Sequence, residues 1–273
     1  MTLDSTDLAL YRFVEYGEAE AYFDFYSAAP ASWEVIVKRI GSAILLLAPQ
    51  MDVVLFNRVI GLGLGESIRE NMVDEVLEQY QRAGVRNFAI QVSPAAQPIL
   101  VEWLATRGLS AQDRWSKVYR TIDPPAIIPT DLRTQRIGQE FAEAFAEVAS
   151  AAFGMPKDIL PWLANHVGRN NWYHYLAFDG DNPVATAALY VRKEVGWLGI
   201  GSTLPAYRRR GAQGALMARR ITDAAGLGCR WLVTETGEDL PEHPNPSYHN
   251  MLRTGFKLAY HRTNYCPPRN MKV

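Results

Sequence analysis

The amino-acid sequence predicts an α/β protein built from two similar halves. Short apolar runs typical of strands alternate with stretches whose apolar residues recur at helical spacing. Residues 123–130, Asp-Pro-Pro-Ala-Ile-Ile-Pro-Thr, interrupt both patterns, because prolines remove backbone donors and fix φ. Glycine positions also recur in the two halves: Gly84 precedes one predicted strand, and Gly228 precedes another. We therefore expect domains at 1–122 and 131–273, joined by a linker at 123–130.

The first half begins with a predicted helix over residues 5–27. Short apolar runs predict its strands, at 43–47, 53–56, 60–64, 88–92 and 115–121. Helical spacing of apolar residues predicts its other helices, near 72–80 and at 95–106.

The second half repeats this order of elements. Its strands are predicted at 132–137, 172–178, 184–191, 197–201, 231–234 and 257–265. Its helices are predicted at 141–152, 159–166, 211–225 and 247–254. The run Asp179-Gly-Asp-Asn-Pro183 between two of the strands is typical of a hairpin turn.

Composition narrows the class of protein. The 273 residues carry 28 basic and 29 acidic side chains, a balance that argues against nucleic-acid binding as the main function. No apolar run has the ~18 residues of a membrane span, and residues 1–20 lack a signal-peptide pattern. Cys229 and Cys266 are too few for a disulfide framework, and the five histidines are scattered. We expect a cytoplasmic protein with no membrane partner and no metal.

The stretch from Trp197 to Leu216 contains the motif most informative about chemistry. A predicted strand leads through Arg208-Arg-Arg210 and Gly211 into a helix. The first N–H groups of a helix have no internal partner and attract anions, and glycine lets a ligand approach the backbone closely. The arginines add positive charge beside them. The loop therefore predicts a binding site for a diphosphate.

This loop resembles the cofactor signature of the GNAT superfamily, Gln/Arg-x-x-Gly-x-Gly/Ala. Arg208 fills the first position and Gly211 the fourth. The sixth position, which is Gly or Ala in the family, is Gln213, and Gly214 and Ala215 follow it. This departure from the signature leaves the path of the loop open, but it does not change the role that the resemblance implies.

A second segment, 245–256, resembles the end pattern of the same family. Asn245 and Ser247 match positions that contact the cofactor, and the pattern closes with Gly255-Phe256. The tyrosine that often protonates the leaving thiolate in the family is replaced by Met251, which has no proton to donate.

The resemblance implies tandem GNAT-like domains, each a mixed, mostly antiparallel sheet flanked by helices, with a degenerate first copy. It implies acetyl-CoA as the acyl donor. The residues that it places on the cofactor are Ser202, Thr203, Leu204, Arg208, Arg209, Arg210, Gly211, Ala212, Gln213, Gly214, Ala215, Asn245 and Ser247.

The function implied is an N-acetyltransferase in which a primary amine of a small molecule or peptide attacks the thioester directly. Glu235 ends a predicted strand where the acceptor enters, and is the candidate general base. Tyr248 is the candidate proton donor in place of Met251. Acidic residues at 235, 238, 239 and 242 suggest a cationic acceptor. We expect a monomer or homodimer.

Two other interpretations remain open. The absence of the usual acid favours a non-catalytic acyl-CoA sensor or interaction protein. The arginines at 208–210 allow nucleic-acid binding, which would show steep salt dependence.

Overall fold

The structure is a computed structural model that describes residues 5–65 and 67–268. Within these residues, eleven strands form a continuous sheet in the order β1-β2-β3-β4-β11-β5-β10-β9-β8-β7-β6. The first strands along the chain are β1 (Ile36–Ile40), β2 (Ala43–Leu47), β3 (Arg58–Ile60), β4 (Ala89–Val92) and β5 (Ser110–Thr121). The others are β6 (Arg133–Ile137), β7 (Trp172–Asp179), β8 (Asn182–Arg192), β9 (Val195–Thr203), β10 (Trp231–Gly237) and β11 (Lys257–Cys266). The predicted α/β class with a mixed, mostly antiparallel sheet is confirmed.

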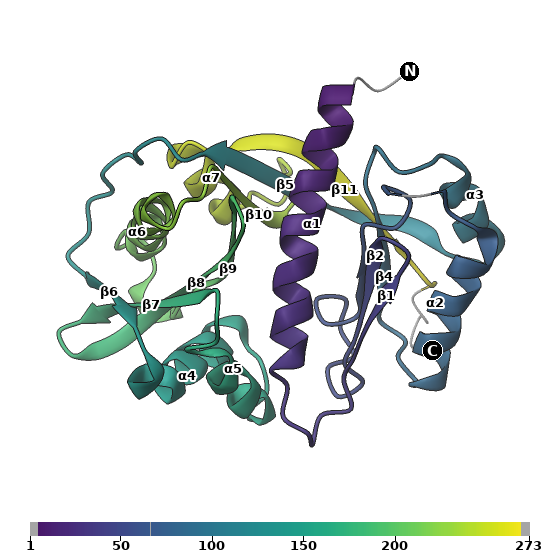
Figure 1. The fold of residues 1–273 in the computed structure, drawn as a ribbon. Coiled ribbons are helices and arrows are strands. Elements are labelled where there is room, and N and C mark those ends of the chain that lie inside the picture. Colours follow the sequence, from purple (N-terminus) through teal and green to yellow (C-terminus); the bar gives the residue numbers. More distant parts are fainter. Residues whose placement is uncertain (1–4, 66, 269–273) are drawn as a thin grey trace.

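Helices cover both faces of the sheet. They are α1 (Ser5–Ser27), α2 (Glu70–Arg82), α3 (Ile99–Thr106), α4 (Ala142–Phe153), α5 (Leu160–His166), α6 (Ala212–Gly226) and α7 (Pro246–Arg253). Helices α1, α4 and α5 share one hydrophobic core on one face. On the other face, α2 and α3 pack against the first half and α6 and α7 against the second. Figure 1 shows α1 standing between the two halves.

Strands β5 and β11 join the halves by crossing from one to the other (Figure 1). Strand β5 precedes the linker in sequence, yet it pairs antiparallel with β10 from Trp231↔Thr121 to Gly237↔Trp115. Strand β11 lies between β4 and β5 and pairs with both. The division at 123–130 stays a prediction about the sequence, because the sheet itself continues across that boundary.

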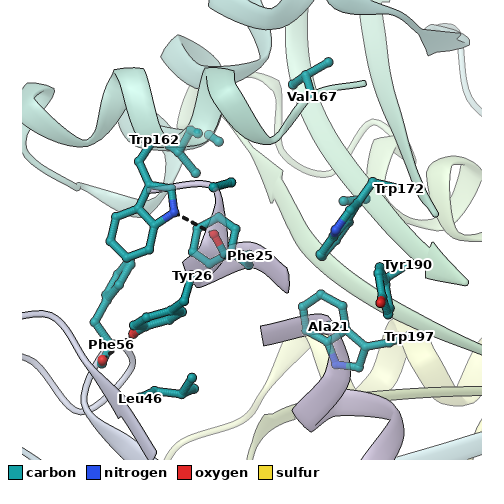
Figure 2. Close-up of a cluster of buried hydrophobic side chains, with 14 of the residues drawn as sticks. Ala21, Phe25, Tyr26, Leu46, Phe56, Trp162, Val167, Trp172, Tyr190 and Trp197 are labelled. Atoms are coloured by element: carbon teal, nitrogen blue, oxygen red, sulfur yellow. Dashed lines mark hydrogen bonds between the residues drawn. The ribbon is translucent and has the colours of Figure 1, made fainter. Parts of the chain in front are cut away.

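A shared aromatic core also ties the halves together (Figure 2). The indole N–H of Trp162 on α5 donates to the carbonyl of Phe25 on α1 over 2.9 Å. The same ring stacks on the ring of Phe25, with 4.9 Å between the ring centroids. Trp162 is fully buried, so the first helix is fixed against the second half rather than lying on its surface.

Two strand predictions in the first half are wrong. Residues 53–56 form turns, because the side chain of Asn57 caps the segment: its Oδ1 accepts from the N–H of Ala48 over 2.8 Å. The strand predicted at 60–64 instead spans Arg58–Ile60 and ends at Gly61, whose φ of +83° leaves the β region. Strand β1, at 36–40, was not predicted because it carries Lys38 and Arg39 on an exposed edge.

Candidate active site

Strands β9 and β10 separate in the middle of the sheet and open a pocket. They pair in parallel only from Trp231↔Val195 to Val233↔Trp197. Beyond these pairs a cavity of about 280 Å³, here called the splay pocket, lies between the two strands. Its walls include four aromatic side chains, from Tyr22, Trp115, Phe153 and Trp197.

A bulge in β9 shapes this pocket. Ile200 and Gly201 have no partners in the register with β8, and Ile200 has a φ of +49°. The carbonyl of Ile200 accepts a hydrogen bond from Thr186 Oγ1 over 2.9 Å, which fixes the bulge. A bulge turns backbone groups away from the regular ladder. Ile200 and Gly201 both line the pocket, so their backbone lies next to whatever occupies it.

A second cavity, of about 700 Å³, follows the start of α6 and is here called the loop groove. Ten of the thirteen predicted cofactor residues line it: Ser202, Thr203, Arg208, Arg209, Gly211, Ala212, Gln213, Gly214, Asn245 and Ser247. Leu204, Arg210 and Ala215 do not line it. The N–H of Leu204 instead donates to the carbonyl of Val184 over 3.0 Å, within the sheet. The role of these residues in cofactor binding stays a prediction.

Two glycines of the loop, Gly211 and Gly214, are packed so closely against the linker that a side chain would not fit there. Gly211 precedes α6 with a φ of +80°, and a Cβ there would overlap the carbonyl oxygen of Pro129. A Cβ on Gly214 would lie 2.6 Å from a methyl group of Ile128. The sequence suggested that both glycines leave room for a ligand. In the structure, residues 128–130 fill the space on the Cβ side, while residues 211–214 still line the groove.

The three arginines of the loop are not equivalent. Arg210 is held by Asp131 and by Asp179, whose Oδ2 lies 2.9 Å from Nη1. Arg208 and Arg209 are exposed, and Arg209 has no ion-pair partner among residues 5–65 and 67–268. The positive charge available to a ligand therefore comes from Arg208 and Arg209.

A hydrogen-bond network around Gln213 joins α6 to α7 beside the groove. Gln213 Nε2 donates to Ser247 Oγ over 2.8 Å, and its Oε1 accepts from Asn250 over 2.8 Å. Asn245 caps α7 by accepting from the N–H of Ser247 over 3.0 Å. The side chain at the sixth position of the signature thus has a specific structural partner.

Glu235 lies at the edge of the splay pocket, but three cations surround its carboxylate. Its Oε1 accepts from Arg58 over 2.8 Å, and its Oε2 accepts from Lys117 over 3.2 Å and from Arg262. A carboxylate held this way is committed to its partners. These contacts favour a structural role, and its assignment as the general base stays a prediction.

Glu235 belongs to a larger buried charge cluster: Glu15, Glu18, Arg58, Lys117, Glu235 and Arg262. Burial alone would raise the pKa of Glu18, but the charges of Arg262, Lys117 and Arg58 outweigh it and hold that pKa well below its usual range. Three carboxylates balance three cations within this set, so the cluster adds no net charge to the pocket.

The predicted proton donor Tyr248 lies outside both cavities, and most of the acidic residues predicted to attract the acceptor already have partners. Tyr248 lines neither the splay pocket nor the loop groove and packs on the α6–α7 side, whereas Met251 lines the pocket. Glu238 is bound by Arg114, and Asp239 accepts from the N–H of Asn245 over 2.6 Å. The carboxylates at 235, 238 and 239 are thus already engaged.

Comparisons with known proteins identify a family for the part of the chain that contains β9, the loop and α6. Residues 135–244 match the sequence profile of the acetyltransferase (GNAT) family. These residues form a GNAT domain. The match covers the bulged strand, the loop, α6 and β10, and it supports acyl transfer from acetyl-CoA as the activity of this domain. It does not extend into the first half, so the origin of that half as a degenerate GNAT copy stays a prediction.

Solved structures share the fold across both halves. A GCN5-related N-acetyltransferase from Kribbella flavida is 17% identical, with a TM-score of 0.63 over 94% of this chain and 95% of that one. A tandem GNAT protein from the clavulanic acid biosynthesis pathway is 14% identical, with a TM-score of 0.59 over 96% and 94%. A GCN5-related N-acetyltransferase from Sphaerobacter thermophilus is 17% identical, with a TM-score of 0.57 over 82% and 79%. No curated protein matches the chain significantly.

Sequence reasoning missed part of the splay pocket. Tyr22, Leu55 and Trp115 come from the first half and line the splay pocket, and Arg220 lines it from α6. The signal in the sequence was the pair Glu15 and Glu18, three residues apart in the helix predicted at 5–27, because carboxylates on the buried face of a helix need cationic partners.

Among the described residues, no helix has the length and apolar character needed to cross a bilayer.

Proposed function

We propose that the protein is an N-acetyltransferase that transfers an acetyl group from acetyl-CoA to a primary amine of a small molecule or peptide. The observation that carries the proposal is the continuity of the loop groove with the splay pocket. Phe153, Gly201, Gln213 and Ser247 line both cavities. One elongated donor can therefore reach from the start of α6 to the gap between β9 and β10.

The donor's diphosphate is proposed to lie at the first turn of α6. The unpaired N–H groups there attract an anion, and the exposed side chains of Arg208 and Arg209 supply positive charge. The pantetheine arm then follows β9 past Ser202 and Thr203, whose backbone borders the groove.

The reaction proposed is direct attack of a neutral amine on the thioester carbonyl. Backbone groups at the β9 bulge, around Ile200 and Gly201, lie where they can stabilise the developing oxyanion. Holding amine and thioester together supplies much of the rate. Cys229 is not a nucleophile in this scheme, because it is buried and burial raises its pKa to about 11.

The acceptor is proposed to bind against the aromatic wall contributed by both halves. Tyr22 and Trp115 reach the pocket from the first half, and Phe153 lines it from the end of α4. This gives the first half a purpose in acceptor recognition. The proposal includes a cytoplasmic monomer or homodimer with no nucleic-acid or membrane partner, in keeping with the balanced charge.

Three measurements test the proposal. Calorimetry should detect binding of acetyl-CoA and of CoA to the full chain, and a panel of amines should then release free thiol from acetyl-CoA. The variant Trp115→Ala should raise KM for any accepted amine while leaving KM for acetyl-CoA unchanged. Absence of any binding of CoA or acetyl-CoA would overturn the assignment.

A non-catalytic acyl-CoA sensor is the second candidate. It is favoured by Met251 at the position of the usual acid and by the three cations on Glu235. Tight acetyl-CoA binding without turnover of any amine would support the sensor.

A further inference from the structure

Arg220 is a buried cation in the splay pocket that the proposed reaction has not yet used. It lies on α6 and is 3% exposed. Its Nε donates to the carbonyl of Leu216 over 3.2 Å, and its Nη1 donates to the carbonyls of Ala188 and Gly199 over 3.0 and 3.3 Å. These carbonyls orient the guanidinium without neutralising it.

No carboxylate among the described residues forms an ion pair with Arg220, and its Nη2 makes no hydrogen bond to any of them. Arg58 and Arg262 differ, since each is paired with at least two buried carboxylates. Burial lowers the pKa of Arg220 to about 10, so the side chain is still charged at neutral pH. An uncompensated buried charge is costly, which indicates that an anion completes this site during function.

The position of Nη2 identifies where that anion would lie. A Cβ built on Gly201 would be 3.8 Å from Nη2, and Gly201 lines both the loop groove and the splay pocket. It is also part of the β9 bulge. If acetyl-CoA occupies the groove as proposed above, its thioester reaches this junction. The inference rests on that proposed function.

We propose that Arg220 is a catalytic residue whose Nη2 stabilises the CoA thiolate as it leaves. The amine nitrogen forms a bond to the carbonyl carbon, the carbon–sulfur bond breaks, and sulfur departs with the electron pair. The proton lost by nitrogen reaches sulfur through water. A fixed positive charge beside the sulfur makes departure possible without a proton donor at Met251, which lines the same pocket.

The test measures the thiol pKa of bound CoA, so it requires no knowledge of the acceptor. Calorimetry first establishes that CoA binds, and the ultraviolet absorbance of the thiolate is then followed against pH. The thiol pKa of free CoA is measured in parallel as the reference, and a nearby cation should lower the pKa of the bound thiol by about one unit or more. Arg220→Met should return the pKa to the free value, whereas Arg220→Lys should retain part of the shift.

A matched control stands one position away. Arg219 lies on the same helix, is partly exposed and pairs with Asp223, so Arg219→Met should leave the thiol pKa unchanged. With an accepted amine, Arg220→Met should lower kcat by about 10²-fold with little change in KM for acetyl-CoA. If Arg220→Met does not fold, Arg220→Gln replaces it, because glutamine can still donate to a neighbouring carbonyl.

The outcomes separate the two proposals. If CoA binds but its thiol pKa is the free value in the natural protein, or is unchanged in the Arg220 variants, the role of Arg220 is overturned while the acetyltransferase proposal stands. If CoA does not bind at all, both are overturned.

Discussion

A 2.8 Å hydrogen bond joins Arg58 Nη1 to Glu235 Oε1 and so connects β3 of the first half to β10 of the GNAT domain. Arg58 is fully buried, and its guanidinium also lies over the rings of Tyr22 and Trp115, 4.3 and 4.8 Å from their centroids. An internal ion pair thus lies against Tyr22 and Trp115, two of the aromatic side chains that line the splay pocket.

Glu235→Gln should destabilise the protein. Removing one member of a buried ion-pair cluster leaves cations uncompensated, at a cost of about 3–5 kcal/mol. Urea denaturation of the full chain measures the loss. Glu238→Gln is the control, because Glu238 pairs with the half-exposed Arg114, and its loss should cost less than about 1 kcal/mol. If Glu235→Gln is as stable as the natural protein but loses activity, Glu235 is the general base after all.

Gly211→Ala should reduce both stability and CoA affinity. The residue has a φ of +80°, and an added Cβ would collide with the backbone of Pro129. We expect a loss of at least ~1–2 kcal/mol in the free energy of unfolding, from the left-handed conformation alone. The control is Gly226→Ala, at the other end of α6, where a Cβ meets nothing within 4 Å. Gly226→Ala should be neutral or slightly stabilising, and equal effects at both positions would contradict the account of the loop.

Arg209→Gln should weaken CoA binding by about tenfold, which corresponds to a charge-assisted hydrogen bond worth about 1.4 kcal/mol. Arg210→Gln should change affinity far less, since Arg210 is already held by Asp131 and Asp179. Calorimetry at low and high salt compares the two variants. A larger loss of affinity in Arg210→Gln than in Arg209→Gln would show that the wrong arginine has been assigned to the diphosphate.

The buried pair His166–His174 should make stability fall in mild acid. Their rings share a 2.9 Å hydrogen bond, and burial lowers the pKa of His174 to about 3 and holds that of His166 well below its usual range. A histidine with a lowered pKa contributes its full stability above the unfolded value near ~6.5 and loses it as pH falls toward the folded value.

Between pH 7 and pH 5, protonation of the unfolded chain at His174 should therefore lower the free energy of unfolding by about 2 kcal/mol. His166, whose pKa is also lowered, adds a loss of the same sign, so denaturant titrations of the natural protein and of His174→Gln at both pH values isolate this difference. His174→Gln should reduce the dependence, and an unchanged dependence in that variant would assign the effect to other groups.

Local sequence patterns were sufficient to predict most of the helices and strands. The helix predicted at 5–27 matches α1, and the strand–loop–helix order from Trp197 to Ala225 matches β9 and α6. These succeeded because hydrophobic periodicity and glycine placement are properties of neighbouring residues.

What the sequence could not predict depends on contacts between distant residues. Glu235 was placed at a strand end, but nothing near it in the sequence shows that Arg58 and Lys117, more than a hundred positions away, reach its carboxylate. Arg220 was not singled out because it lies within a predicted helix, and nothing nearby in the sequence shows that it lacks a carboxylate partner. The alternation of apolar and polar residues within β5 and β11 does not specify which strands they pair with, so their crossing between the halves could not be predicted.

The place of β11 between β4 and β5 has a consequence for how the chain matures on the ribosome. Residues 257–266 follow every other strand along the chain, so neither half can complete its sheet until they have been synthesised. The exposed edges of β4 and β5 must wait unpaired until then, a state prone to aggregation. Nascent chains stalled before residue 257 should accordingly bind chaperones more than those released at full length.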